Sequence, residues 1–208
     1  MIVTKNITKK FNNKPIFENL NFSAKKSTIT TIVGQSGKGK TTFLRILSNL
    51  EKVDEGTILI DKEPLVEDGK YVNHKKQKQI LSKIGMIFQH FNLFPNLNVI
   101  NNMLIVKDDL QKAENLLERF NLSDKKNEPV SHLSGGQKQR LSIIRALMND
   151  PEIIFFDEPT SALDEQNFNS IVNLILELKE KNYTILVVTH DLKLVENLNC
   201  DVFDFNKI

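Results

Sequence analysis

The feature that most constrains the fold of this chain is a glycine-rich stretch between a run of β-branched residues and an amphipathic segment. Residues 34–41 read Gly-Gln-Ser-Gly-Lys-Gly-Lys-Thr, which is a glycine, four further residues, a glycine, a lysine and a threonine. Residues 28–33 before it have the composition of a buried strand, and residues 41–50 after it carry apolar side chains at helical spacing. A strand, a glycine loop and a helix in this order predict a phosphate-binding loop in an α/β domain.

The residue types of this loop suit a nucleotide polyphosphate. Glycines let the backbone curl so that its N–H groups point at phosphate oxygens, and the following helix presents its positive N-terminal end to the same anion. We expect Lys40 to reach the β- and γ-phosphates and the Thr41 hydroxyl to bind Mg²⁺. By itself the pattern indicates a P-loop nucleotide-binding protein of any class. The predicted nucleotide contacts are Gly34, Gln35, Ser36, Gly37, Lys38, Gly39, Lys40, Thr41 and Thr42.

Two acidic residues follow a second apolar run. Residues 153–156 read Ile-Ile-Phe-Phe, and Asp157 and Glu158 come directly after them. Ligands of parallel α/β sheets bind at the carboxyl ends of the strands, so this pair is expected to lie beside the phosphate loop. We predict that Asp157 holds Mg²⁺, mostly through water, and that Glu158 polarises the attacking water.

A third motif decides the resemblance. Residues 133–137 read Leu-Ser-Gly-Gly-Gln and precede Lys-Gln-Arg and a predicted helix. With the two motifs above, the chain resembles the ATP-binding cassette (ABC) superfamily over nearly its whole length. The resemblance implies ATP and Mg²⁺ as cofactors, ATP hydrolysis as the activity, and a signature loop that caps the nucleotide held by a partner subunit. The signature residues predicted to contact that nucleotide are Ser134, Gly135, Gly136 and Gln137.

The resemblance assigns four further positions in the order in which the family has them. Phe11 stands where an aromatic ring stacks on adenine, although ordinary packing stays open for it. Gln89 would join the water shell of Mg²⁺ and sense a transmembrane partner, and His190 would hydrogen-bond the γ-phosphate. Asp164 ends the segment 161–164, Ser-Ala-Leu-Asp, which crosses the dimer interface in the family. The implied catalytic residues are Glu158, His190, Gln89 and Lys40, and the implied metal ligands are Thr41, Gln89 and Asp157.

The order of the segments predicts an α/β fold. We expect a P-loop NTPase core, a RecA-like mixed sheet with flanking helices, together with an N-terminal antiparallel β subdomain and an α-helical signature subdomain. Residues 1–208 are expected to form a single ABC ATPase domain. Its core and β subdomain would comprise 1–88 and 150–208, and its Q-loop and helical signature subdomain about 89–149. The lysine-rich stretch 70–83 is predicted to be a solvated helix or loop.

Charge and composition limit the partners. The formal net charge is +2, which gives no reason to expect a nucleic acid. The longest apolar runs span a few residues, whereas a membrane-spanning helix needs about 20, and the N-terminal residues lack the apolar run of a signal peptide. The single cysteine, Cys200, fits a reducing compartment. We therefore expect a peripheral protein at the cytoplasmic face of the cell membrane. It would be held there by transmembrane permease subunits and would dimerise on ATP with an identical or a second cassette.

The transport class rests on fewer residues. Residues 89–97, Gln-His-Phe-Asn-Leu-Phe-Pro-Asn-Leu, and residues 158–164 resemble the polar amino acid uptake subfamily, which implies amino acid import. The apolar stretch 91–94 is a candidate permease-docking surface, with core packing as the alternative. Two other functions stay open: an ATPase of the lipoprotein-release, cell-division and macrolide-export group, and a non-transport module that regulates a soluble partner. Two departures from the family are Lys38, where a small residue is usual, and a short segment between 101 and 133.

Overall fold

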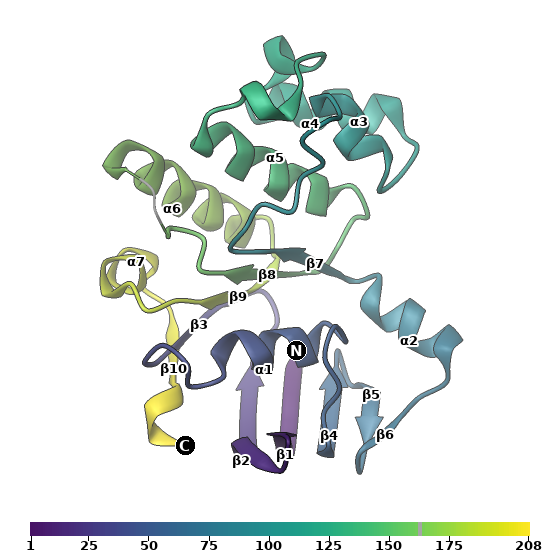
Figure 1. Cartoon of the computed structure of the whole chain (residues 1–208), viewed down its shortest axis with the longest axis vertical. Coiled ribbons are helices and arrows are strands. Elements are labelled where there is room, and N and C mark those ends of the chain that lie inside the picture. The colour runs from purple at the N-terminus through teal and green to yellow at the C-terminus, as the bar shows by residue number, and fades with distance from the viewer. Residues whose placement is uncertain (162–163) are drawn as a thin grey trace.

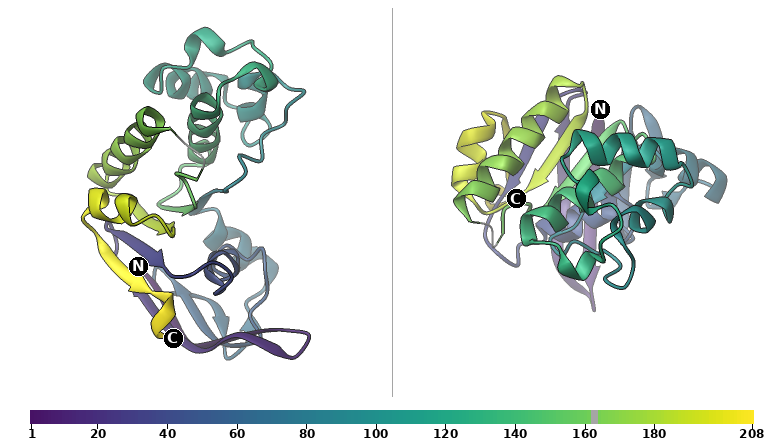
Figure 2. Two further views of the ribbon diagram at one scale, coloured as in Figure 1. Left: turned by 60° about the vertical axis from the view of Figure 1, so that its left-hand side comes forward. Right: turned by 90° about the horizontal axis from the view of Figure 1, so that it is seen from above.

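Helix α1 (Lys40–Leu47) lies between two five-stranded sheets in residues 1–161 and 164–208, which the computed structural model describes. Figure 1 shows an antiparallel sheet below α1, a parallel sheet above it, and further helices beyond the parallel sheet. In the left view of Figure 2 the antiparallel sheet and the most distant helices stand at opposite ends of the molecule. Because Ala162 and Leu163 lie outside the described residues, the middle of the predicted interface segment 161–164 is not part of this description.

The antiparallel sheet has the strand order β2-β1-β4-β5-β6. Its first hairpin closes through Asn12 and Asn13, which both have positive φ (50° and 62°). Asparagine tolerates this left-handed conformation, and a two-residue turn of this kind matches the twist of the paired strands. The strands are β1 (Ile2–Phe11), β2 (Lys14–Ala24), β4 (Glu55–Ile60), β5 (Glu63–Glu67) and β6 (Lys70–Tyr71).

The second sheet has the order β10-β3-β9-β8-β7, and all four of its neighbouring strand pairs are parallel. The predicted α/β fold class is confirmed, with parallel and antiparallel pairing divided between two sheets. The strands are β3 (Ile29–Val33), β7 (Ile84–Ile87), β8 (Ile153–Asp157), β9 (Thr184–Val188) and β10 (Asp201–Asp204).

Both faces of the parallel sheet are covered, which explains its unbroken apolar runs. In β8, Phe155 packs with α1 and the antiparallel sheet, whereas Ile154 and Phe156 belong to the core under the outer helices. In β9, Leu186 and Val187 divide in the same way. Side chains that alternate along each strand therefore build two separate cores.

The outer helices fall into two groups in Figure 1. Helices α6 and α7 lie near the parallel sheet, α3 and α4 gather at the top of the view, far from α1, and α5 lies between them and β7, against which it packs. The proposed boundaries of this helical part, about 89–149, stay a prediction. The helices are α2 (His74–Leu81), α3 (Val99–Leu104), α4 (Leu110–Arg119), α5 (Gly135–Leu147), α6 (Glu165–Glu180) and α7 (Leu192–Leu198), with 3₁₀ turns at Ser123–Lys125, Val130–His132 and Phe205–Lys207.

Two short helices and the short strand β5 were not predicted from the sequence. Helices α3 and α7 have 6 and 7 residues, too few to show a periodic apolar pattern. Strand β5 has 5 residues with a glutamate at each end. Its two buried residues are too few to form a recognisable apolar pattern in the sequence. In the lysine-rich stretch 70–83 a helix or loop was predicted, and α2 is a helix there, whereas residues 70–71 form strand β6 because they pair with β5.

Within the described ranges, no helix combines the length and the apolar composition that a membrane span requires.

A group of phenylalanines joins α1 to both sheets. The Phe43 ring on α1 lies 5.2 Å from Phe22, 5.6 Å from Phe205 and 6.2 Å from Phe17, measured between ring centroids. Phe43 is fully buried. The contacts with Phe22 and Phe17 are edge-to-face and the contact with Phe205 is tilted, and such aromatic pairs add to the free energy gained by burying the rings.

We expect Phe43→Ala to lower the free energy of unfolding by about 3–5 kcal/mol, because it leaves a cavity where α1 meets both sheets. Urea unfolding followed by circular dichroism measures the change. The matched control is Phe94→Ala, since Phe94 is 47% exposed and should change stability little. Equal losses in the two variants would contradict the placement of the core.

Candidate functional site

The glycine-rich loop 34–39 curls tightly before α1. Gly37 and Gly39 have φ of 81° and 95°, conformations that favour glycine. A Cβ on Gly39 would also collide with the Ile16 side chain of β2, so a larger residue is excluded there by two independent constraints. In the described residues no side chain caps the N-terminus of α1. The first N–H groups of the helix are therefore left for an anion.

Lys40 is folded back into the loop. Its side chain is buried, with the residue 6% exposed, and its ammonium donates to the carbonyl oxygens of Gly34 (2.7 Å) and Gln35 (3.0 Å). Both acceptors are neutral main-chain groups, so the positive charge is hydrogen-bonded but not neutralised by them. A buried cation beside uncapped helix N–H groups makes this loop strongly attractive to phosphate.

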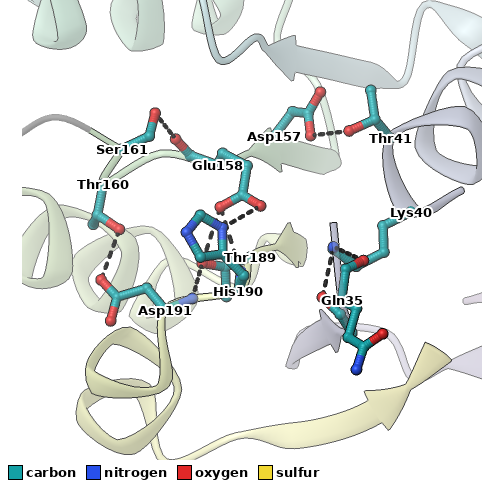
Figure 3. Close-up of polar contacts among 11 residues, drawn as sticks. Gln35, Lys40, Thr41, Asp157, Glu158, Thr160, Ser161, Thr189, His190 and Asp191 are labelled. Atoms are coloured by element: carbon teal, nitrogen blue, oxygen red, sulfur yellow. Dashed lines mark hydrogen bonds and ion pairs between the residues drawn. The ribbon is translucent and has the colours of Figure 1, made fainter. Parts of the chain in front are cut away.

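Thr41 and Asp157 meet between α1 and the end of β8 (Figure 3). The Thr41 hydroxyl donates to Asp157 Oδ1 over 2.9 Å. Asp157 is 4% exposed, and burial raises the pKa of its carboxyl group, against the opposing effect of the Thr41 hydrogen bond. A buried carboxylate bonded to a neutral hydroxyl fits a hard divalent cation, since both groups are oxygen ligands of the kind that Mg²⁺ prefers. Bound there, Mg²⁺ would neutralise charge on the phosphate oxygens.

Glu158 follows Asp157 and turns toward β9 (Figure 3). Its Oε1 lies 2.9 Å from His190 Nδ1, and its Oε2 accepts from the Thr189 hydroxyl (3.3 Å) and the His190 main-chain N–H (3.4 Å). Its backbone has φ of 49°, which is uncommon for a glutamate and marks a strained position of the kind found at functional sites. The structure thus brings together the two residues for which the resemblance implied chemistry at the γ-phosphate.

The hydrogen bonds that hold the segment around Glu158 and His190 in place were not predicted from the sequence. The Asp191 main-chain N–H donates to the Thr189 hydroxyl (3.0 Å), and its Oδ2 accepts from Thr160 (3.1 Å). Asp191 also caps α7 by accepting from the N–H of Lys193 (2.9 Å). An aspartate marks a helix start when a periodic apolar segment follows it, and α7 is too short to show that pattern, so neither the cap nor the bond to Thr160 could be predicted from the sequence.

These segments enclose one pocket at the carboxyl edge of the parallel sheet. The loop, α1, β2, the segment after β7 and the ends of β8 and β9 all contribute to its wall. Its chemistry combines helix N–H groups, a buried ammonium, a hydroxyl, an amide, a carboxylate and an imidazole. The lining residues are Ile16, Ser36, Gly37, Gly39, Lys40, Thr41, Thr42, Gln89, Glu158 and His190.

Some predicted contacts lie beside this pocket. Gly34 and Gln35 supply the carbonyls that hold Lys40, and Asp157 stands behind Thr41. Lys38 is exposed and lines an adjoining hollow, which shares Ile16 with the pocket. Phe11 is 43% exposed at the end of β1, where Lys9 Nζ stands 4.6 Å from its ring centroid, and it does not line the pocket. Its role in stacking therefore stays a prediction.

The signature residues form a second, separate feature at the start of α5. Ser134 and Gln137 make a capping box, in which the Ser134 hydroxyl accepts from the Gln137 N–H (3.3 Å) and Gln137 Oε1 accepts from the Ser134 N–H (2.9 Å). A Cβ on Gly135 would meet open space, whereas a Cβ on Gly136 would collide with Asn167 of α6. Asp164 caps that same helix through the Asn167 N–H (2.8 Å). None of these residues lines the pocket.

Comparison with known proteins decides the family. The model of the ABC transporter family matches residues 17–161. The chain belongs to the ABC transporter family. It is 38% identical over 203 residues to the glutamate/aspartate import ATP-binding protein GltL of Escherichia coli K12, covering 92% of this chain and 81% of that protein. It is also 38% identical over 201 residues to the arginine transport ATP-binding protein ArtM of Bacillus subtilis 168, covering 92% and 82%.

A solved structure supports the same conclusion. The ATP-binding cassette MJ0796, in a dimeric post-hydrolysis state bound to ADP and Pi, superposes with a TM-score of 0.84 at 33% identity, covering 98% of this chain and 94% of that one. The predicted ABC ATPase identity, its likeness to the polar amino acid uptake subfamily and the cassette fold are therefore confirmed. The chain is an ATP-binding ATPase of this family.

Lys38 offers a test of the loop geometry. We expect Lys38→Ser to weaken ATP and ADP binding by a similar factor, about two- to fivefold at low salt, because an exposed cation beside the loop acts on the shared phosphates through the solvent. Titration with a fluorescent nucleotide measures both affinities, and salt should shrink the difference. The control is Lys75→Ser on α2, an exposed lysine that lines neither the pocket nor the adjoining hollow. Unchanged affinities at low salt would place the Lys38 charge away from the nucleotide.

Proposed function

We propose that this chain is the ATPase subunit of an amino acid importer, in which ATP-driven dimerisation moves substrate through a separate membrane permease. The observation that carries the proposal is the separation of two anion-binding features, the pocket at α1 and the loop at α5. The similarity to GltL and ArtM, which are named for import or transport of amino acids, supports the substrate class.

Within one subunit, each side chain has a distinct task. Lys40 and the N–H groups of α1 bind the phosphates, and Thr41, Gln89 and Asp157 hold Mg²⁺, which neutralises phosphate charge when bound. Glu158 accepts a hydrogen bond from the attacking water and polarises it. His190 lies against Glu158 at 2.9 Å, at the edge of the pocket, where it can donate to the γ-phosphate.

We expect Glu158→Gln to keep ATP binding while turnover falls by about 10²-fold or more, because the amide cannot accept the proton of the attacking water. Lys40→Ala is expected to lose nucleotide binding, since the pocket then lacks its buried cation. Phosphate release and nucleotide titration measure the two effects. A Glu158→Gln protein with unchanged turnover would remove Glu158 from this role.

A dimer completes the site. The pocket residues surround the phosphates from one subunit, and the Ser134 loop stands on a different part of the same chain, outside the pocket. A two-fold axis would let each Ser134 loop cap the nucleotide of the other subunit, which makes the interface isologous. Hydrolysis would then remove a phosphate that both subunits bind, and the dimer would reopen. The partner is a second copy or a related cassette.

Sedimentation of the Glu158→Gln protein tests this arrangement. We expect monomers without nucleotide and dimers with ATP, because slow hydrolysis preserves the bridging phosphate. Ser134→Arg should prevent dimerisation and leave ATP binding to the monomer intact. Monomers at saturating ATP and high protein concentration would contradict the dimer, and a series of concentrations is needed because dimerisation follows mass action.

The helical part offers a surface for the permease. Four large apolar side chains are exposed there: Phe94 (47%), Ile105 (56%), Val106 (36%) and Leu110 (50%). Fully buried Asn102 ties the Phe94 backbone to α3 by accepting from its N–H (2.8 Å) and donating to its carbonyl (3.1 Å). Of the stretch 91–94 singled out above, only Phe94 is a large exposed apolar residue, and Leu93 packs against the core. Docking here would place the chain at the cytoplasmic face of the membrane.

We expect the double variant Phe94→Ser, Ile105→Ser to be recovered less with the membrane fraction of its own cells, because docking would lose apolar area. Leu50→Ser is the control, since Leu50 is 51% exposed in the turn that follows α1. Immunoblots of separated membranes measure the distribution. Unchanged recovery of the double variant would contradict docking at this surface, and co-purification with a soluble protein in place of a permease would favour a non-transport module.

A further inference from the structure

Arg145 connects two parts of the site that are far apart in the chain. It stands in the last turn of α5, the helix that begins beside Ser134. Its guanidinium donates to the main-chain carbonyl of Asn92 (2.8 Å) and, more weakly, to that of Phe91 (3.4 Å). These carbonyls follow Gln89, which lines the nucleotide pocket, by two and three residues.

The contact uses two nitrogens of one planar group. The acceptors are neutral carbonyls of adjacent residues, and two different terminal nitrogens of the guanidinium each bind one of them, at a spacing that the planar fork fixes. A lysine ammonium would have to reach both carbonyls with a single nitrogen on a flexible side chain. Asn92 has φ of 50°, so the chain turns sharply at the point where it is held. Arg145 is half-buried, and burial lowers the pKa of its guanidinium, as expected for a cation without a carboxylate partner in this contact.

We propose that Arg145 is a positioning residue that makes Gln89 and Ser134 move together. Ser134 and Arg145 are separated by 11 residues of one helix, about 16 Å at 1.5 Å per residue. A nucleotide that displaces Gln89 in its own subunit therefore shifts α5, and with it the loop that faces the partner's nucleotide. The inference rests on the proposed dimer.

A purely structural role predicts something different. A cation in the last turn of a helix stabilises that helix through its dipole, and lysine does this as well as arginine. A positioning role requires the fork, so Arg145→Lys should lose part of the coupling while the stability of α5 is kept. The two roles are separated by a measurement of dimerisation together with ATP binding to the monomer.

The experiment compares Arg145→Met and Arg145→Lys with their parent, all carrying Glu158→Gln. We expect the monomers to bind ATP with the parent's affinity, while the protein concentration at half-dimerisation rises about tenfold for Arg145→Met and by less for Arg145→Lys. The matched control is Arg119→Met on α4, which removes a hydrogen bond to Glu177 (2.7 Å) in the same part of the molecule. It should dimerise like the parent.

Three results would overturn the inference. They are parent-like dimerisation of Arg145→Met, an equal loss in the Arg119→Met control, and a loss of monomer ATP binding that matches the loss of dimerisation. If Arg145→Met does not fold, Arg145→Lys decides: a dimerisation midpoint above the parent's, with ATP binding to the monomer unchanged, supports positioning, and a parent-like midpoint contradicts it. Failure of the Glu158→Gln parent to dimerise would instead refute the dimer itself, so the two failures are distinguishable.

Discussion

Helix α1 begins at the carboxyl edge of the parallel sheet, and contacts on two sides hold it there. Gly39 lies against Ile16 with no room for a Cβ, and the Phe43 ring fills the space between the sheets. Because the helix cannot shift, its uncapped N–H groups point at one fixed place. The ends of β8 and β9 then bring Asp157, Glu158 and His190 to that place.

The charges around α1 are hydrogen-bonded but not neutralised by their nearest partners. Lys40 and Asp157 are both nearly inaccessible to solvent, and an isolated buried charge is costly. Carbonyl oxygens hold the lysine and a hydroxyl holds the aspartate, so neither contact supplies an opposite charge. A magnesium nucleotide would supply both, an anion for the lysine and a cation for the carboxylate. The same site explains why Glu158 tolerates a left-handed backbone that costs about 1–3 kcal/mol, since three hydrogen-bond contacts fix its carboxylate.

Helix α5 has a different kind of constraint, because both of its ends are engaged. At one end the capping box orders the Ser134 loop and Gly136 packs closely on Asn167. At the other end Arg145 holds the segment that follows Gln89. A helix fixed in this way can change orientation only as a unit. This suits the proposed dimer, in which a loop of one subunit would respond to the nucleotide bound by its own chain and act on that of the other.

Local motifs could be predicted from the sequence because their geometry depends on neighbouring residues. The glycine loop before α1, the acids after β8 and the signature segment around Ser134 each lie within one short segment, where residue type and spacing set the backbone. They were sufficient to give the fold class and the family. The contacts of Glu158 with Thr189, of Thr160 with Asp191 and of Arg145 with Asn92 join residues 31 to 53 positions apart, as does the close approach of Gly136 and Asn167. Only tertiary packing decides which of many possible partners a side chain meets at such separations, because that choice depends on how whole helices and strands lie against one another.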